Sequence, residues 1–356
     1  MNPFLNPWFL FQILKSYLLD TNRLYRMSSR NLKKFQDKAI KKMVQYAYDV
    51  PIYKNKYKEC GVHPDDINGI DDIQKLPFIT KDDIRKNLPD GIVSPTFNKG
   101  KAITGSTSGT TGPPSPIYGN MYAAAKWLCG EVRIMKEHNI NWRKTRITVI
   151  TDLSENSIER KYIIDGIISN LKPFFSLNNM QILHSFDDPK KTIEKINSFQ
   201  PEFISGNPGM FKKLAQLKRM GYGKDIRPRC MTTVGAVLDN FLKKIIEETF
   251  ETQLFDGYGA TEVGPIAFQC KKGKYHINSD LVYLEAIDDN GEWVSPGELG
   301  HVVATRLFGE GTPIIRYTGI DDLITITDGI CNCGLAGKLI KEIHGRETQS
   351  IVLQDG

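Results

Sequence analysis

The middle of the sequence alternates between two kinds of segment. Short stretches rich in β-branched residues are separated by longer ones with an apolar residue every three or four positions. The first kind indicates strands and the second amphipathic helices. The strand candidates are Arg146–Thr151, Gln181–Phe186, Glu202–Ser205, Met231–Val234 and Gln253–Asp256. The helix candidates are Pro189–Phe199, Gly209–Met220 after a cap at Asn207, and a segment from a cap at Asp239 to about Thr249. This alternation predicts parallel βαβ units and an α/β fold.

Beyond Gly264 the pattern changes to short strand candidates separated by turn residues such as Asp288-Asp289-Asn290-Gly291. The candidates are Val282–Ile287, Gly300–Leu307, Pro313–Tyr317, Asp322–Thr327, Leu339–His344 and Ser350–Gln354. Short strands with frequent turns predict an antiparallel, barrel-like β region.

Helical signals precede the alternating region. Residues 31–48 carry apolar side chains at helical spacing and should end near Pro51. Thr80 is placed to cap a short helix, and Asn120 to cap a helix over Met121–His138. The apolar run Pro7–Leu19 is too short and too interrupted for a membrane span. We expect an amphipathic helix packed on the body of the protein, with weak membrane-surface contact as the alternative.

Composition limits the class of protein. The 356 residues are 40% hydrophobic and 25% charged, and the net charge is +6. Lysines are spread along the chain, so the sequence predicts no nucleic-acid partner. The six cysteines form no secreted disulfide framework, and there is no signal-peptide pattern. These features predict an ordinary globular protein in the cytoplasm.

The segment Thr104–Pro116 concentrates hydroxyl groups and glycines more than any other stretch. Glycines allow sharp turns, and successive backbone N–H groups in such turns bind anions. The segment therefore suits a polyphosphate, although a flexible Ser/Gly linker has a similar composition. It is not a Walker loop, because no Gly-Lys-Ser/Thr follows at the required spacing.

Four motifs follow one another in a fixed order. They are Thr107-Ser108-Gly109-Thr110-Thr111-Gly112, then Gly235-Ala236, then Gly257-Tyr258-Gly259-Ala260-Thr261-Glu262, and last Pro313–Tyr317 with Asp321-Asp322 and Gly345-Arg346. This constellation resembles the acyl-adenylate-forming (ANL) superfamily of acyl-CoA synthetases, nonribosomal adenylation domains and luciferases. Leu76–Asp83 and Cys331-Asn332-Cys333-Gly334 resemble the phenylacetate–CoA ligase branch and its CapK-like capsule-biosynthesis relatives in particular.

The resemblance implies nucleotide-binding roles for these motifs. The hydroxyl-rich loop, Thr107, Ser108, Gly109, Thr110, Thr111 and Gly112, would hold the β- and γ-phosphates of ATP. Tyr258, between Gly257 and Gly259, would stack on adenine beside the Gly235-Ala236 turn. Asp321 would bind the ribose hydroxyls, with Asp322 as the alternative, and Arg346 would contact the nucleotide near a hinge. Ser115 stands where the superfamily often has lysine, and Glu347-Thr348-Gln349 replace the usual acidic hinge residues.

The catalytic candidates are Thr261 and Glu262. By the resemblance, Thr261 would meet the α-phosphate and Glu262 would ligate Mg²⁺, a hard cation that prefers carboxylate oxygen. No Gly-x-Ser-x-Gly nucleophile elbow occurs, so a serine hydrolase is not indicated.

A second metal candidate consists of Cys270, His276, Cys331 and Cys333. Three thiolates and one imidazole suit tetrahedral zinc, and some phenylacetate-branch relatives resemble this set in carrying a structural zinc. The spacing Cys270-x5-His276 is not that of a standard finger, and two surface thiols with an unrelated histidine are the alternative.

The resemblance implies an adenylation domain over residues 1–345, with α/β subdomains of about 1–180 and 181–265 and a β region of about 266–345. Residues 346–356 would be the hinge and the start of a mobile C-terminal domain that is absent from the sequence. The expected activity is ATP- and Mg²⁺-dependent activation of a carboxylic acid, an aryl acid among the candidates, to acyl-AMP with release of pyrophosphate, for transfer to CoA or another acceptor.

Two alternatives remain open from the sequence. One is a nucleotide-binding scaffold, or truncated enzyme, without turnover, and the other is an adenylyltransferase acting on a flavin-like coenzyme. The expected partners are the acid and the nucleotide, and a homodimer is left open.

Overall fold

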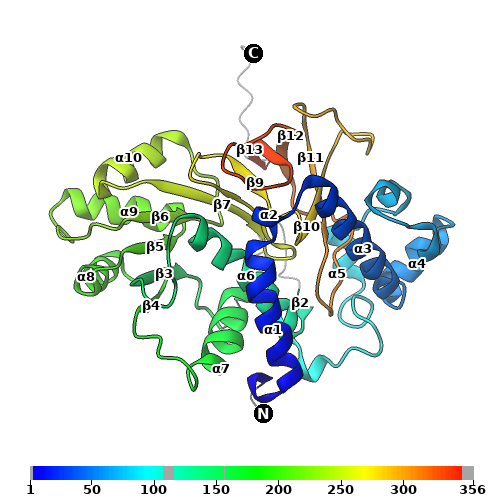
Figure 1. Cartoon of the computed structure of the whole chain (residues 1–356), viewed down its shortest axis with the longest axis horizontal. Helices are drawn as coiled ribbons and strands as arrows, with labels where there is room; N and C mark the ends of the chain where they lie inside the picture. Colours follow the sequence, from blue (N-terminus) through cyan, green and yellow to red (C-terminus); the bar gives the residue numbers. More distant parts are fainter. Residues whose placement is uncertain (1–2, 107–115, 156, 347–356) are drawn as a thin grey trace. The chain divides into compact units, whose positions relative to one another are not determined.

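The computed structural model describes residues 3–106, 116–155 and 157–346 (Figure 1). The chain forms two compact units, which we call the first and second units. The first unit contains Met1–Asn22 and Gly100–Gly273, and the second contains Arg23–Lys99 and Lys274–Gly356. The predicted division into three subdomains and a hinge stays a prediction.

The first unit is built on a sheet with the strand order β4-β3-β5-β6-β7-β8. The strands from β4 to β7 are mutually parallel, and β8 runs antiparallel to β7. Their bounds are β3 (Ile147–Thr151), β4 (Met180–His184), β5 (Phe203–Gly206), β6 (Cys230–Thr233), β7 (Leu254–Ala260) and β8 (Gly264–Gln269). All five predicted strands of this region are confirmed, with shifts of one or two residues, except that β7 continues to Ala260. The α/β fold class is confirmed.

Helices connect these strands, and their first turns are capped by side chains. The caps at Asn120, Asn207 and Asp239 are as predicted, and Asp188 is a further one. The main helices are α6 (Met121–Glu137), α8 (Pro189–Phe199), α9 (Pro208–Arg219) and α10 (Asn240–Phe250). In each case a side-chain oxygen of the cap residue accepts a hydrogen bond from a backbone N–H of the first turn. The cap residues are, in the same order, Asn120, Asp188, Asn207 and Asp239. Such caps satisfy N–H groups that have no partner inside the helix.

Apolar side chains cover both faces of the parallel sheet. Met231 and Leu254 lie on one face, in a cluster formed with α8, α9 and α10. Their chain neighbours Cys230 and Phe255 point to the opposite face and pack in a separate cluster with Phe203. Alternate residues of a strand point to opposite faces, so both faces of these strands are buried, as is typical of parallel sheets.

Shorter elements complete the first unit. They are η1 (Pro3–Leu5), α1 (Pro7–Leu19), η2 (Asp20–Asn22), the hairpin β1 (Ile103–Ser106) and β2 (Pro116–Gly119), the π-helical segment η6 (Arg160–Ile168) and α7 (Ser169–Leu171). The predicted N-terminal helix is confirmed as α1. Its expected packing on the body is confirmed, since Ile13 packs against a cluster with α6, but most of its large apolar side chains are exposed. Within the described parts of the chain, no helix is both long and apolar enough to cross a bilayer.

The second unit contains an antiparallel sheet with the order β10-β11-β12-β13-β9. The bounds are β9 (Tyr275–Ile277), β10 (Val282–Ile287), β11 (Leu299–Arg306), β12 (Asp322–Thr327) and β13 (Leu339–Arg346). The antiparallel character of this region is confirmed. The predicted strand Pro313–Tyr317 is wrong, because the chain makes only isolated bridges through Tyr317 and Arg316 has a φ of 46°. Ser350–Gln354 lie outside the described residues.

Helices from residues 23–99 pack in the second unit. They are α2 (Arg23–Arg26), α3 (Ser29–Ala47), α4 (Pro51–Glu59), η3 (Pro64–Asp66), η4 (Ile70–Lys75) and α5 (Lys81–Lys86), with η5 (Lys99–Lys101) at the boundary in the sequence. The predicted helix over 31–48 is confirmed as α3. Helix α3 ends at Ala47, close to Pro51 as expected. Pro51 is itself the first residue of α4, a position where the missing N–H of proline costs nothing. Thr80 caps α5 in a capping box with Asp83, as predicted.

Candidate active site

The turn after β6 and the second half of β7 lie next to each other in the first unit. Thr233 pairs with Asp256 in the parallel register; Gly257 directly follows Asp256, and Gly235-Ala236 begin two residues after Thr233. Gly235 has a φ of 92°, a conformation that glycine adopts without strain, and both residues of the turn are exposed. Two of the sequence motifs are therefore brought together at the carboxyl ends of adjacent parallel strands, where open α/β sheets bind ligands.

The segment Gly257–Ala260 belongs to β7 and pairs with β8, with a bulge between Tyr258 and Gly259. The bulge brings the two strands close together. A Cβ atom on Gly259 would lie 2.9 Å from the carbonyl oxygen of Gly264, which is closer than side chains tolerate. The glycine at this position, next to Tyr258, is thus required by the close approach of the two backbones.

Thr261 and Glu262 occupy the tight turn between β7 and β8. The N–H of Val263 donates to the carbonyl of Ala260 at 3.1 Å and closes the turn. Glu262 is buried, whereas Thr261 is partly exposed. Gly264 completes the turn with a φ of 95°, and the Trp127 ring lies 3.2 Å from the position of an added Cβ. The two catalytic candidates are therefore on a short turn whose geometry is fixed on both sides by glycines.

Asp256 is a buried polar residue of this region that the sequence reasoning missed. Its carboxylate accepts a hydrogen bond of 2.6 Å from the hydroxyl of Thr233, and its N–H donates to the side chain of Gln269 at 2.9 Å. These bonds connect β6, β7 and β8 immediately before the Gly257–Glu262 motif. A carboxylate at the last strand position before a Gly-Tyr-Gly run was the available signal.

Helix α6 covers the same motif and contributes a second missed residue, Glu131. Trp127 contacts Gly264, and Ile134 lies 3.8 Å from the position of a Cβ on Gly257. Glu131 is four residues after Trp127 and three before Ile134, so it lies on the same helix face. Burial raises the pKa of the Glu131 carboxyl to about 7. An acidic residue within an apolar helix face, four positions after a tryptophan, was the sequence signal.

The polyphosphate-loop candidates, Thr107, Ser108, Gly109, Thr110, Thr111 and Gly112, lie outside the described residues, as does Ser115. The structure describes the two strands on either side of them. β1 and β2 pair antiparallel, with Ser106 opposite Pro116. The hydroxyl-rich segment thus connects the two strands of a hairpin in the first unit.

The ribose-binding candidate Asp321 lies in the second unit, just before β12. It is exposed and has a φ of 62°, an uncommon conformation for a residue other than glycine. The alternative, Asp322, is the partly buried first residue of β12 and is paired in register with Arg346 of β13. Adjacent residues on this turn therefore differ in exposure, and the exposed carboxylate is the one at Asp321.

Arg316, from the same motif, is an interior residue. Its guanidinium lies 3.1 Å from Glu285 and donates to the carbonyl oxygens of Gln74 and Leu76 at 3.2 and 2.8 Å. It also stacks over the Phe78 ring, 4.0 Å from the centroid. The arginine thus fixes the backbone of the motif and is not available to a ligand.

A cluster of metal-binding side chains lies in the second unit. His276 of β9 is fully buried, and its Nε2 lies 3.1 Å from the Sγ of Cys333. Cys331, on the same loop as Cys333, is within 4.8 Å of both ligand atoms. Thiolate sulfur and imidazole nitrogen are the preferred ligands of zinc. The fourth candidate, Cys270, is a buried residue of the first unit, six positions before His276.

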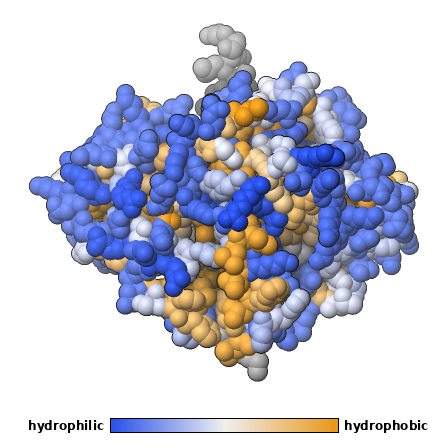
Figure 2. Space-filling view, in the orientation of Figure 1, coloured by the Kyte–Doolittle hydropathy of each residue, from blue (hydrophilic) through white to orange (hydrophobic). Residues whose placement is uncertain are grey.

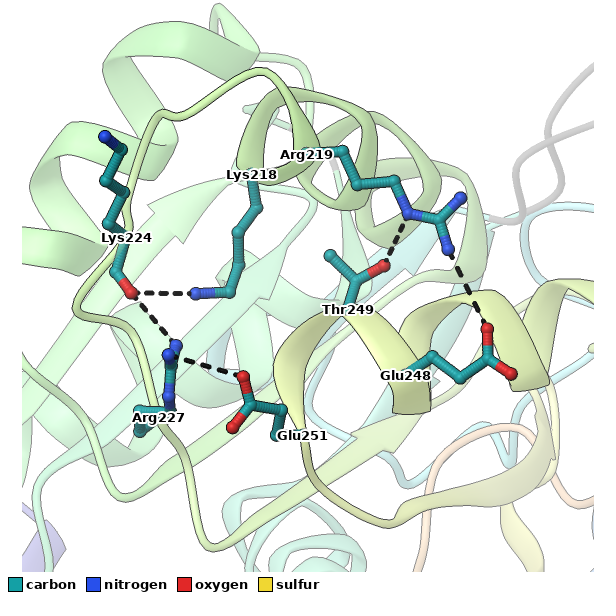
Figure 3. Close-up of a pocket in the computed structure, with 7 residues that line it drawn as sticks. All are labelled: Lys218, Arg219, Lys224, Arg227, Glu248, Thr249 and Glu251. Atoms are coloured by element: carbon teal, nitrogen blue, oxygen red, sulfur yellow. Dashed lines mark hydrogen bonds and ion pairs between the residues drawn. The ribbon is translucent and has the colours of Figure 1, made fainter.

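A concavity of about 460 Å³ lies elsewhere on the first unit, at the C-terminal ends of α9 and α10 (Figure 3). Helices that follow parallel strands end at the amino edge of the sheet, opposite the turns that bind ligands. The Nζ of Lys218 donates to three backbone carbonyls at 3.1 Å, and Arg227 lies 3.3 Å from Glu251. The concavity is therefore separate from the motif residues, and these two cations are engaged within the protein.

Solved structures identify the fold. A 2-hydroxyisobutyryl-CoA ligase, solved in an open conformation with 2-HIB-AMP and CoA, is similar with a TM-score of 0.74 and 18% identity, over 90% of this chain and 76% of the ligase. The same ligase in the postadenylation state gives a TM-score of 0.77, over 92% of this chain and 70% of the ligase. The chain has the fold of acyl-adenylate-forming ligases.

Sequence relatives support the resemblance to one branch. The chain is 27% identical over 332 residues to a phenylacetate–coenzyme A ligase of Pseudomonas putida, covering 91% of this chain and 72% of that one. It is 24% identical to the Thermus thermophilus ligase and 25% identical to protein CapK of Staphylococcus aureus, covering 74% and 63% of those proteins. No protein-family model matches the sequence. The resemblance to the phenylacetate–CoA ligase and CapK branch is confirmed, and the chain is an acid–CoA ligase-like enzyme.

Proposed function

We propose that this protein activates a carboxylic acid with ATP and Mg²⁺, forming an acyl-adenylate and pyrophosphate. The observation that carries the proposal is the Gly257–Glu262 segment, which begins beside the Gly235-Ala236 turn at the carboxyl edge of the parallel sheet and ends in a turn with a buried carboxylate, Glu262. Such an edge is where nucleotides bind in open α/β sheets. Relatives named as CoA ligases support the same reaction.

The proposed roles follow the positions of the motifs. Tyr258 stacks on adenine beside Gly235 and Ala236, and the segment from Thr107 to Gly112 holds the β- and γ-phosphates. Asp321 accepts the ribose hydroxyls with its two carboxylate oxygens, and Arg346 contacts the nucleotide. Mg²⁺, when bound, neutralises phosphate charge, and Glu262 is its carboxylate ligand.

The proposed chemical step needs no covalent bond to the protein. One oxygen of the substrate carboxylate attacks the α-phosphorus of ATP and forms a new P–O bond. The bond from the α-phosphorus to the bridging oxygen of pyrophosphate breaks, and pyrophosphate leaves with the electron pair. The protein acts by aligning the two anions, with Thr261 donating its hydroxyl hydrogen to the α-phosphate. CoA is the proposed acyl acceptor, because relatives are named as CoA ligases.

We also propose that His276, Cys331, Cys333 and Cys270 bind a structural zinc ion. The convergence of one imidazole and two thiols in the second unit supports this, and Cys270 is proposed as the fourth ligand on its ligand chemistry and its closeness to His276 in the sequence. The ion would hold β9 to the loop between β12 and β13. It takes no part in the proposed reaction, which we place in the cytoplasm, where ATP and CoA are available.

Acid-dependent exchange of labelled pyrophosphate into ATP tests the proposal. The wild type should exchange in the presence of Mg²⁺ and at least one acid from a panel of aryl, hydroxy and straight-chain acids. The variant Glu262→Gln should lower the rate by about 100-fold or more, since it removes charge from the metal site. Glu248→Gln, an exposed change on α10, is the matched control and should retain the rate. Absence of exchange with every acid contradicts the proposal.

A further inference from the structure

Helix α1 carries apolar side chains on its outward face as well as on the face toward the protein. On the inward face Ile13 packs beside α6, Phe9 and Gln12 are partly buried, and Ser16 is the helix's buried residue. Outward, Trp8 is 68% exposed and Phe11, Leu14 and Leu18 are each 53% exposed. A helix that only packs on a globular body turns its apolar face inward. The outward apolar face of α1 therefore has a role other than packing on this chain.

This face extends beyond the helix into one patch, which we call the α1 patch: the exposed apolar side chains of η1 and α1 together with Phe174 and Phe175. The indole N–H of Trp142 donates to the Tyr17 hydroxyl at 2.9 Å, and the Trp142 and Phe175 rings are 6.4 Å apart. Figure 2 shows the apolar side chains gathered over α1. Apolar patches of this kind mark interaction surfaces.

The charges around the α1 patch are basic. Residues 3–19 include no aspartate or glutamate, and Lys15 is exposed on the helix. Arg143 lies over the Phe175 ring at 5.6 Å, and Lys144 and Lys172 are exposed next to Arg143 and Phe174 in the sequence. A second copy of the chain in a two-fold contact would bring these cations against one another. An anionic surface complements them.

We propose that the α1 patch docks the protein on the surface of an anionic lipid bilayer. Leucine and phenylalanine side chains would enter the acyl boundary, and Trp8, Tyr17 and Trp142 are the residue types that prefer the headgroup level. Lys15, Arg143, Lys144 and Lys172 would lie against the negative headgroups. The helix lies on the membrane and does not cross it. This inference does not depend on the proposed reaction.

Vesicle co-sedimentation tests the proposal. The intact chain should sediment with phosphatidylcholine vesicles containing phosphatidylglycerol, more than with phosphatidylcholine alone, and less as salt increases. The variant Trp8→Gln/Phe11→Gln/Leu18→Gln should lose binding to both kinds of vesicle, because it removes apolar side chains of the α1 patch. It should stay folded, because its changes are confined to exposed side chains. Phe186→Gln/Met220→Gln removes equally exposed apolar residues elsewhere on the first unit and should bind as the wild type does.

A second variant tests the charge. Lys15→Gln/Lys144→Gln/Lys172→Gln should reduce the preference for anionic vesicles severalfold and weaken the salt dependence, while the folded state, checked by circular dichroism, is retained. Two results would overturn the proposal. One is no vesicle binding by the wild type. The other is a concentration-dependent dimer in light scattering that the Trp8, Phe11 and Leu18 changes abolish, without vesicle binding.

Discussion

Arg316 and Glu285 form a buried ion pair inside the second unit. The guanidinium Nη2 lies 3.1 Å from Oε1 and Nε lies 3.4 Å from Oε2, so the two groups meet at two points. Trp293 donates to the same carboxylate at 2.7 Å. Burial raises the pKa of Glu285, although Arg316 opposes this effect. The pair fixes the backbone from which the chain continues to Asp321, which explains an interior arginine within the Pro313–Tyr317 motif.

Removing this arginine should destabilise the protein strongly. The variant Arg316→Met leaves Glu285 buried without its cation, and we expect the free energy of unfolding to fall by about 3–5 kcal/mol. Urea unfolding followed by tryptophan fluorescence measures it, since Trp293 reports on the second unit. Arg229→Met, which breaks an exposed pair with Glu202, should change stability by less than about 1 kcal/mol. Equal losses from both variants would show that burial does not govern the pair.

The bulge between β7 and β8 gives a second prediction. Gly259→Ala places a methyl group 2.9 Å from the Gly264 carbonyl oxygen and should destabilise the protein by about 1–3 kcal/mol. It should also lower pyrophosphate exchange, because the Thr261-Glu262 turn follows directly. Gly329→Ala is the matched control: the atom nearest to its added Cβ is 3.4 Å away, an ordinary contact, and it should be near neutral. The account is wrong if the two alanine variants behave alike.

The third prediction concerns pH. Burial raises the pKa of Glu131 to about 7 from 4.5, so the folded protein retains a proton that the unfolded chain has lost between these two values. Stability should therefore decrease as the pH rises from about 4.5 through about 7. Glu131→Gln removes this contribution and should flatten the decrease, measured as urea midpoints from pH 5 to pH 8. Glu248→Gln, exposed on α10, should leave the pH profile unchanged. An unaltered profile for Glu131→Gln would contradict the assignment.

The cysteine cluster gives a fourth prediction. Purified protein should contain one zinc ion per chain by elemental analysis, and Cys333→Ser should reduce it to a trace. Cys60→Ser changes an exposed thiol outside the cluster and should retain the metal. A chelator should lower the thermal unfolding midpoint of the wild type and of Cys60→Ser, since bound metal stabilises the folded state. Wild-type protein without zinc, after growth in zinc-containing medium, would rule out the site.

Local patterns predicted the regular elements well. Asn120, Thr80 and Asp239 cap helices as predicted. A short polar side chain just before a helical apolar pattern can accept a free backbone N–H of the first turn, which makes such caps recognisable in the sequence. The parallel strands followed from their apolar runs between helices. Pro313–Tyr317 has the composition of a strand but does not form one. Arg316 makes a buried ion pair with Glu285, and this contact between residues distant in the sequence outweighs the local strand preference.

The candidate site was harder to predict than the fold. Motif order identified the Gly257–Glu262 segment, but its inclusion in β7 depends on the partner β8, which has no clear strand pattern. Glu131 and Asp256 each had a sequence signal, but only the fold shows the burial and the neighbours that distinguish them from other carboxylates. Helix α1 has the expected helical period, but no sequence pattern shows whether an apolar face meets protein or another surface.

The central claim is that a carboxylate attacks the α-phosphorus of ATP. Oxygen labelling tests it most directly. The chain is incubated with ATP, Mg²⁺ and an acid that supports exchange, labelled with ¹⁸O in its carboxylate, and the acyl-adenylate is trapped with hydroxylamine. Attack at the α-phosphorus leaves one heavy oxygen on AMP, and the account predicts labelled AMP in proportion to the trapped acid. Unlabelled AMP, or release of ADP in its place, would contradict it.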